Sequence, residues 1–240
     1  MMLVLASASP ARLATLRAAG IDPEVEVADV DEDGLVETLM AAARARHGGP
    51  HPAAEVVLEL ARAKAEEVAR RRTARGAAPA LVLGCDSMLE IHGEVVGKPG
   101  TPEVAVERWR QMRGGGGLLH TGHWLVDLRG GTANDDGATG GGAPGDAPAG
   151  LGRTATTAVH FADLTDEEIE AYVATGEPLV VAGGFTVDGL GGPYVTAIAG
   201  DHHTVVGLSL PLLRELLGQL GVPIHRLWNA GRVVSSHQEP

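Results

Sequence analysis

The sequence has little cysteine and few aromatic residues, and both shortages limit what the protein can be. Cys85 is the only cysteine among 240 residues, so no disulfide can form within the chain, and we expect a reducing, cytoplasmic location. Aromatic residues make up 3% of the chain and hydrophobic residues 44%, so the core must consist of leucine, valine and alanine. Aliphatic segments of this kind, separated by glycine and proline, favour an α/β fold in layers.

Positive charge is scarce as well. The chain has 19 Lys and Arg against 31 Asp and Glu, a net charge of −12. This balance argues against duplex nucleic acid and against a membrane surface as partners, because both usually bind a basic face. No apolar run approaches the roughly 18 residues that cross a bilayer, and the short apolar start lacks the basic lead of a signal peptide. A polyanion can still bind where a few cations converge or a divalent metal bridges.

Hydrophobic periodicity and capping residues predict alternating strands and helices in one large domain, or in two lobes that share a cleft. Helix starts are indicated at Ser9-Pro10, Pro52, Thr101-Pro102 and the capping box Thr165-Asp-Glu-Glu168, and the last helix carries leucines up to Gly221. Strands are expected at residues 2–6, 24–28, 81–83, 88–91, 94–96, 118–128, 154–161 and 195–198.

Two segments are expected to lie outside the packed domain of residues 1–222. Residues 129–153 consist mainly of glycine, alanine, aspartate and proline, and such a segment cannot bury enough apolar surface to offset its ordering entropy. We therefore expect a mobile surface insertion there. Residues 223–240 are expected to form a C-terminal tail.

One carboxylate stands out because an apolar strand runs directly into it. Residues 80–83 are apolar, and after Gly84 and Cys85 comes Asp86, which we expect at the end of that strand. Twelve residues later Lys98 is held between a glycine and a proline. Charges placed in this way could face a phosphorylated ligand, although Asp86 could equally cap a turn and Lys98 could be solvated.

Ser7, Ser9 and Arg12 form a second candidate site, where the first strand meets a helix. A helix N-terminus offers free backbone N–H groups to an anion, and an arginine can bind two phosphate oxygens at once. The alternative is that Ser9 only caps the helix and Arg12 is solvated. Three further residues could serve the site, or could simply be solvated or turn residues. They are Lys64 in a helix, Glu32 in an acidic run that could bind Mg²⁺ or Mn²⁺, and Asp188 between glycines.

Other familiar sites do not fit the sequence. The segment before Lys98 is one residue too short for a P-loop, and Pro99 stands where that motif needs Ser or Thr. Histidine pairs such as His202-His203 lack a third ligand at zinc spacing. No G-x-S-x-G elbow of a serine hydrolase occurs.

Short motifs around these residues follow one another in the order of the Maf family, which the chain closely resembles from Met1 to about Val222. The motifs are Leu3-Val-Leu-Ala-Ser-Ala-Ser-Pro-x-Arg12, Leu60-Ala-x-x-Lys64-Ala, Gly84-Cys-Asp86-Ser, Gly97-Lys-Pro, His120-Thr-Gly, Glu168-Ile-x-x-Tyr172, Ala182-Gly-Gly-Phe and Gly200-Asp…Val206-Gly-Leu. Members of this family are described as nucleoside triphosphate pyrophosphatases associated with septum formation.

The resemblance implies an elongated mixed β-sheet flanked by helices, with two lobes around a central cleft as in inosine-triphosphatase-like folds, and often a homodimer. It implies hydrolysis of standard or modified nucleoside triphosphates to the monophosphate and pyrophosphate, helped by a divalent metal, Mg²⁺ or Mn²⁺. By position in the family's motifs, Asp86 is the proton acceptor, and Arg12, Lys64 and Lys98 correspond to its cationic residues.

The resemblance also assigns an acidic residue after the second strand, which falls on Glu32, or on Asp31 if the register shifts by one. A metal would be held by Glu32 or Asp86. Members that prefer pyrimidine nucleotides usually carry glutamine where this chain has Asp188, and Ser87 replaces a commoner threonine. A carboxylate only accepts hydrogen bonds, whereas an amide donates and accepts, so Asp188 should change which base edge is recognised.

Two other functions use the same residues. A nucleotide-binding regulator of cell division would bind in the same cleft without turnover. A phosphatase that acts on sugar phosphates would release inorganic monophosphate instead of pyrophosphate.

Overall fold

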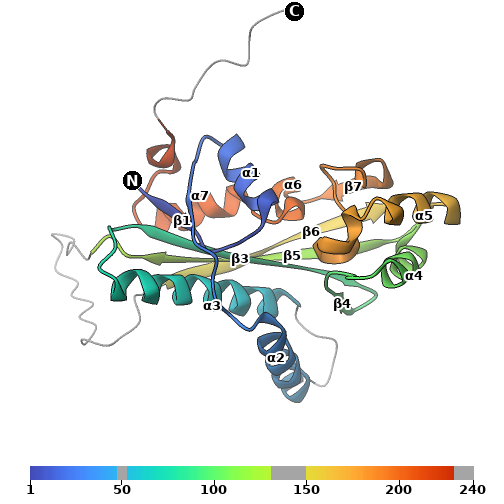
Figure 1. Ribbon diagram of the computed structural model, residues 1–240, viewed down its shortest axis with the longest axis horizontal. Helices are drawn as coiled ribbons and strands as arrows, with labels where there is room; N and C mark the ends of the chain where they lie inside the picture. The colour runs from blue at the N-terminus through green and yellow to red at the C-terminus, as the bar shows by residue number, and fades with distance from the viewer. Residues whose placement is uncertain (48–52, 131–149, 230–240) are drawn as a thin grey trace, which may run out of the picture.

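The computed structural model describes residues 1–47, 53–130 and 150–229, in which a seven-stranded mixed sheet runs the length of the molecule (Figure 1). The strand order is β2-β1-β3-β5-β6-β7, with β4 also paired to β3, and only the pairs of β1 with β2 and with β3 are parallel. The strands are β1 (Leu3–Leu5), β2 (Glu24–Val25), β3 (Leu81–Ile91), β4 (Glu94–Val96), β5 (Gly116–Asp127), β6 (Gly150–Phe161) and β7 (Val195–Ala199). The expected elongated α/β fold is confirmed.

Helices cover both faces of this sheet. Figure 1 shows α3 along one face and α1, α6 and α7 on the other, while α4 and α5 lie at the far end. The α-helices are α1 (Pro10–Ala18), α2 (Glu32–His47), α3 (Ala53–Ala74), α4 (Pro102–Met112), α5 (Asp166–Ala174), α6 (His202–Val206) and α7 (Leu210–Gln219). Four 3-10 helices are η1 (Glu177–Val180), η2 (Ala182–Gly184), η3 (Gly192–Tyr194) and η4 (Ile224–Leu227). None of the helices in these ranges is long and apolar enough to cross a membrane.

The predicted helix starts are confirmed by their caps. Ser9 accepts from the backbone N–H of Arg12 at the start of α1, and Thr165 forms the complete capping box with Glu168 at the start of α5. Each cap satisfies backbone donors that the first helical turn leaves without a partner. The short α6 was not predicted, because five residues are too few for a hydrophobic period to appear in the sequence.

Successive residues of β3 face different layers of the fold. Val82 packs with Val68 of α3, whereas Leu83 packs with Leu16 of α1 and Leu213 of α7. Because side chains alternate along a strand, even-numbered residues in the first part of β3 face α3 and odd-numbered residues there face α1 and α7. This alternation decides which helix can reach each functional side chain.

A second core lies at the far end of the sheet, around the ring of Trp109. Trp109 makes edge contacts with Phe161 and Tyr172, at centroid distances of 5.5 and 5.6 Å, and its indole N–H donates to the carbonyl of Gly184 at 2.9 Å. The molecule thus has two packed halves that share the long strands β3, β5 and β6.

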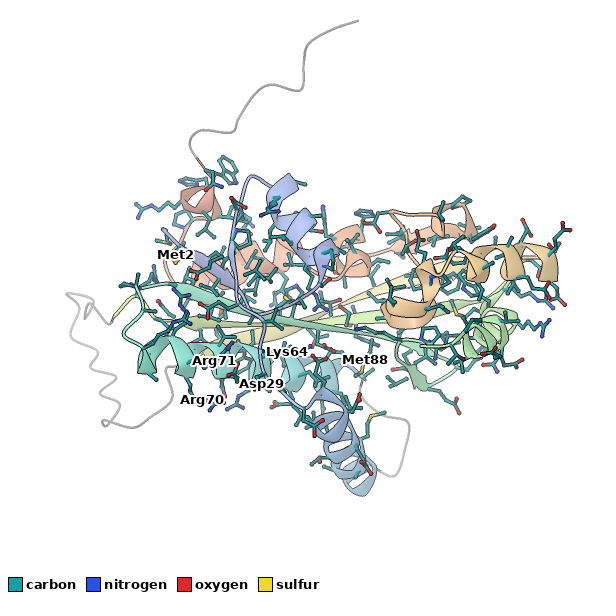
Figure 2. All side chains as sticks on the ribbon, in the orientation of Figure 1. Met2, Asp29, Lys64, Arg70, Arg71 and Met88 are labelled. Atoms are coloured by element: carbon teal, nitrogen blue, oxygen red, sulfur yellow. The ribbon has the colours of Figure 1, made fainter. Side chains whose placement is uncertain are left out.

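Two glycines allow α3 to lie directly on the sheet. A Cβ at Gly84 would collide with the backbone carbonyl of Ala61, and one at Gly122 would collide with that of Val57. Gly122 pairs with Asp86 across β3 and β5. The close approach brings Lys64 of α3 between the helix and the middle of the sheet (Figure 2).

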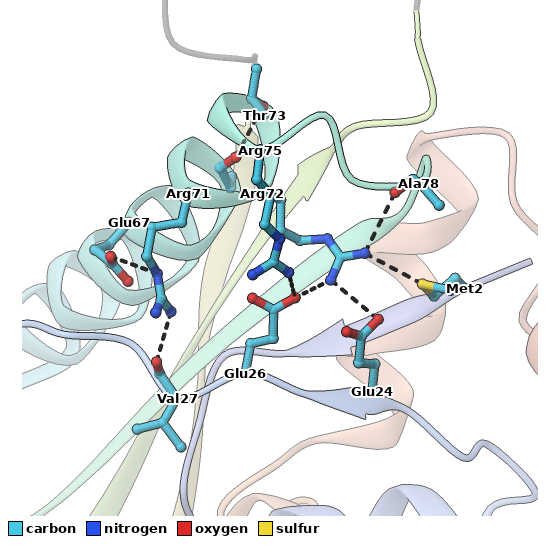
Figure 3. A network of polar contacts seen from close by, with 11 residues as sticks. Met2, Glu24, Glu26, Val27, Glu67, Arg71, Arg72, Thr73, Arg75 and Ala78 are labelled. Atoms are coloured by element: carbon cyan, nitrogen blue, oxygen red, sulfur yellow. Dashed lines mark hydrogen bonds and ion pairs between the residues drawn. The ribbon is translucent and has the colours of Figure 1, made fainter.

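The edge strand β2 is held to α3 mainly by charge (Figure 3). The buried guanidinium of Arg72 makes ion pairs with Glu26 and, at 3.1 Å, with Glu24, and Arg75 binds Glu26 at 2.5 Å. Both residues of β2 are exposed, so apolar burial contributes little here. Although burial acts to raise it, hydrogen bonds to Arg72 and Arg75 hold the pKa of Glu26 below its usual value.

Three sequence expectations need correction. Asp86 does not end a strand, because β3 continues to Ile91 with β5 paired along it. Residues 150–153, predicted to belong to the insertion, form the start of β6, and residues 131–149 lie outside the described residues. Leu227 of the predicted tail packs in the core with Leu16, so the chain stays on the domain to at least this residue.

Candidate active site

The candidate site lies where one edge of β3 has no strand partner. Along this edge β1 pairs with residues 81–83 and β4 with residues 89–91, while β5 covers the opposite edge. Residues 84–88 therefore have a free edge within the part of the chain that the structure describes. Asp86 and Ser87 are in this gap, Ser7 follows β1, and Lys98 follows β4.

Asp86 belongs to a cluster on the α3 face of the sheet. Its Oδ1 lies 2.6 Å from Nζ of Lys64, which also lies 2.9 Å from Oε2 of Glu32, the first residue of α2. The side chain of Lys64 is 7% exposed and that of Asp86 11%, whereas that of Glu32 is 51% exposed. The solvated interpretation of Lys64 is wrong: its ammonium joins two carboxylates, one buried and one half-exposed.

Arg12 forms a second cluster, on the other face. Its Nε donates to the carbonyl of Gly207 at 2.8 Å, Nη1 donates to Oγ of Ser7 at 2.9 Å, and Nη2 donates to Oγ of Ser87 at 3.1 Å. The side chain is buried, so its solvated interpretation is wrong too. Three of its five N–H groups are used in this way, and one on each terminal nitrogen remains for a ligand.

The other predicted site residues are less closely placed. The Oγ of Ser9 accepts from the backbone of Arg12 at 3.4 Å and so acts as a helix cap. Lys98 is exposed, and no described residue makes a hydrogen bond or ion pair with it. Asp188 is exposed as well, in the segment between η2 and η3.

A cavity of about 350 Å³ separates α1 from the segment that carries Asp188. Two of its lining residues, Ala11 and Val206, directly precede Arg12 and Gly207 in the chain. Its walls are mostly small apolar side chains with a few polar groups. The lining residues are Ala11, Ala14, Thr15, Ala18, Ala19, Asp188, His202, His203, Val206 and Leu210.

Two buried groups near the site are fixed in one protonation state. Burial raises the pKa of the Cys85 thiol to about 12, which excludes it as a nucleophile near neutral pH. Burial also lowers the pKa of His123 to about 4. Its Nδ1 donates to the carbonyl of Thr121 at 3.0 Å, and its Nε2 accepts from the backbone N–H of Ser209 at 2.8 Å, as a neutral ring requires.

Sequence reasoning missed residues that complete the Arg12 cluster. Gly207 supplies a backbone carbonyl, and Thr121 contacts the Oγ of Ser87 at 2.9 Å. Both occur within the quoted motifs, in His120-Thr-Gly and Val206-Gly-Leu, but nothing local in those motifs indicates a contact with Arg12.

The chemistry of the Lys64 cluster fits a divalent cation that arrives with its substrate. In the described residues no group of three or more His, Cys, Asp or Glu side chains could hold a metal alone. Glu32 and Asp86 supply two carboxylates, and Mg²⁺ is commonly bound by one or two carboxylates together with phosphate oxygens and water.

Comparisons with known proteins identify the family of this chain. The family model described as "Maf-like protein" matches residues 2–220. A protein of Salinispora tropica named "Nucleoside triphosphate pyrophosphatase" is 50% identical, over 99% of this chain and 91% of that protein. One of Leifsonia xyli subsp. xyli with the same name is 52% identical, over 97% and 99%. A solved HAM1 protein of Coxiella burnetii has a TM-score of 0.37 at 17% identity, covering 68% of this chain and 75% of that one. With a family model that spans nearly the whole chain, this protein belongs to the Maf family.

Proposed function

We propose that this enzyme hydrolyses nucleoside triphosphates between the α- and β-phosphates and releases the monophosphate and pyrophosphate. The observation that carries the proposal is the pair of buried cations, Arg12 and Lys64, on either side of the free β3 edge that holds Asp86. A triphosphate brings about four negative charges, and fixed cations in a partly buried site offset such charge far better than water does. The relatives' names support the same reaction.

Asp86 is the proposed proton acceptor. Lys64 binds Oδ1 and fixes the carboxylate, while Oδ2 makes no hydrogen bond to any residue that the structure describes. Oδ2 is therefore free to accept the proton of an attacking water. A well-placed general base of this kind typically contributes about 10²–10⁴-fold to the rate.

The remaining roles concern charge on the phosphates. The free N–H groups of Arg12 would bind phosphate oxygens, with Ser7 and Ser87 holding the guanidinium in place. Lys98 is exposed next to the gap and would fold over the bound phosphates. Ser9 supports the site indirectly, by capping α1.

A divalent cation, Mg²⁺ or Mn²⁺, would be held by Glu32 and Asp86 together with the substrate. When bound, such an ion neutralises phosphate charge and makes a coordinated water more acidic. Lys64 occupies the space between the two carboxylates, so its ammonium would have to move toward the phosphates as the ion binds. The half-exposed Glu32 can follow such a movement.

Asp188 is the proposed contact to the base. It lines the 350 Å³ cavity beside α1, to which the alanines of this helix contribute small apolar side chains. As an acceptor-only side chain it would favour a base edge that presents N–H donors. Action on modified nucleotides, the homodimer, the cytoplasmic location and a part in septum formation stay predictions.

The test is product identification across a panel of natural and modified nucleoside triphosphates with Mg²⁺ or Mn²⁺. Pyrophosphate and monophosphate in equal amounts support the proposal. Inorganic phosphate with a diphosphate product, or phosphate released from sugar phosphates, would indicate a different hydrolase. Tight nucleotide binding without any product would indicate a regulator.

A further inference from the structure

Thr121 lies at the centre of the hydrogen bonds that surround Arg12. It is fully buried in β5, opposite Ser87 of β3. Its Oγ1 is 2.9 Å from Oγ of Ser87 and 2.9 Å from the backbone carbonyl of Thr204 in α6. One hydroxyl thus joins β3, β5 and α6.

Three hydrogen bonds run in series from Arg12 through Ser87 and Thr121 to the carbonyl of Thr204, and the two ends of the series fix the direction of each one. Arg12 can only donate, so Oγ of Ser87 accepts from Nη2. The carbonyl of Thr204 can only accept, so the hydroxyl proton of Thr121 points to it. The proton of Ser87 must then point to Oγ1 of Thr121. All three hydrogen bonds run one way, from the guanidinium to the end of a helix.

The same hydroxyl fixes a second acceptor of Arg12. Thr204 is three residues before Gly207, whose carbonyl accepts from Nε of Arg12 at 2.8 Å. By holding the end of α6, Thr121 places this carbonyl as well as Ser87. Two of the three groups that orient the guanidinium therefore depend on Thr121, and the third is Ser7.

We propose that Thr121 is a positioning residue for triphosphate binding, which acts by holding the plane of the Arg12 guanidinium. This inference rests on the proposed function, in which the two free N–H groups of Arg12 bind phosphate. A guanidinium that rotates loses its paired contact with phosphate oxygens, and hydrogen bonds to charged groups contribute more than neutral ones. Substrate binding should therefore suffer more than the chemical step.

The chain offers a matched control in Thr157 on β6. Thr157 is also buried, and its hydroxyl donates to the carbonyl of Asp201 at 3.0 Å, at the start of α6. It anchors the same helix but makes no hydrogen bond to Ser87 or Arg12. The carbonyl of Asp201 also accepts from the backbone N–H of Thr204, just as that of Thr204 accepts from Gly207. Loss of either threonine hydroxyl therefore removes one of two donors to a carbonyl at α6, but only the loss at Thr121 also affects the contacts of the guanidinium.

The experiment compares the variants Thr121→Val, Thr121→Ser and Thr157→Val. Each is measured by steady-state kinetics, by thermal unfolding, and by calorimetric binding of a nucleoside triphosphate analogue with a methylene group between the α- and β-phosphates. Thr121→Val should raise KM and the Kd of the analogue about tenfold, as expected when the Arg12 guanidinium loses one hydrogen bond to phosphate. Its kcat should stay within about threefold of wild type. Thr121→Ser should stay within about threefold of wild type in KM. Thr157→Val should lower Tm as much as Thr121→Val and leave KM unchanged.

Several outcomes would overturn the inference. If Thr121→Val and Thr157→Val raise KM equally, Thr121 is only a packing residue. The same conclusion follows if Thr121→Ser, which keeps the hydroxyl, raises KM as much as is expected of Thr121→Val. The serine variant decides this even if the valine variant does not fold. In an Arg12→Lys background Thr121→Val should add no further loss of binding, and an additive loss would also contradict the proposal. If wild-type protein neither binds the analogue nor releases pyrophosphate, the proposed function itself fails and the inference with it.

Discussion

Asp86 and Ser87 are adjacent in the sequence but contact different layers of the protein. Asp86 is bound by Lys64 of α3, whereas Ser87 is bound by Arg12 of α1. Because β1 and β4 leave one edge of this stretch of β3 without a partner, a ligand that contacts both residues must lie across that free edge. The site therefore draws its cations from both sides of the sheet.

Replacing Asp86 by asparagine should keep the fold and remove the proton acceptor. The amide oxygen can still accept from Lys64, so thermal unfolding should change little, while pyrophosphate release should fall about 10²–10⁴-fold. Asp163→Asn, on an exposed carboxylate, is the control and should behave as wild type. Activity of Asp86→Asn within a few fold of wild type would exclude Asp86 as the base.

Replacing Lys64 by methionine should separate catalysis from metal binding. The ammonium lies between Glu32 and Asp86, so its loss removes a positive charge that competes with a divalent ion for both carboxylates. We expect turnover to fall at least 100-fold while Mn²⁺, measured by electron paramagnetic resonance, binds several-fold more tightly. Adding Glu32→Gln should abolish the gain in affinity. Weaker Mn²⁺ binding in Lys64→Met would contradict a metal site at these two carboxylates.

Replacing Asp188 by glutamine should change the ranking of nucleotides more than the rate. The amide can donate as well as accept, so bases with a carbonyl at the recognised edge should gain relative to bases with N–H donors. The readout is kcat/KM for each nucleoside triphosphate, with Glu170→Gln on α5 as the control. An unchanged ranking would mean that the base does not contact Asp188.

His123 should make stability depend on pH. Its pKa is lowered to about 4 in the folded protein, against about 6.5 when unfolded, so the unfolded chain binds more protons between these values. Stability is then complete above pH 6.5 and falls with decreasing pH. Between pH 6.5 and 5 we expect a loss of roughly 1 to 2 kcal/mol in the free energy of unfolding. Denaturant titrations of His123→Asn should lack this loss, whereas those of the exposed His160→Asn should keep it.

Replacing Arg72 by methionine should affect stability and not turnover. The change leaves Glu26, which is largely buried, with Arg75 as its remaining partner, so the cost should stay below the roughly 3–5 kcal/mol of a buried charge left without any partner. Because the pKa of Glu26 is lowered in the folded state, its contribution is present above pH 4.5 and is lost as the pH falls further. In denaturant titrations, the free energy of unfolding should therefore change less between pH 7 and pH 4 in the variant than in wild type. Loss of pyrophosphate release by the folded variant would show that β2 contributes to the site.

Local sequence signals were sufficient for much of the secondary structure. The caps at Ser9 and Thr165 act within one helical turn, so neighbouring residues suffice to predict them. The strand that carries Asp86 was predicted too short, because glycine and aspartate are poor strand formers. Pairing with β5 overrides that preference.

The family, the mixed α/β fold and the candidates Asp86, Arg12 and Lys64 can all be read from short stretches of the chain, because motifs and caps are properties of neighbouring residues. Strand pairing and packing are what place Asp86 inside a strand, bring Lys64 and Arg12 to opposite faces of the sheet, and set Thr121 against Ser87. These relationships depend on which strands pair and on how closely α3 packs over Gly84 and Gly122. Contacts between residues far apart in the chain follow from packing, which no short stretch of sequence encodes.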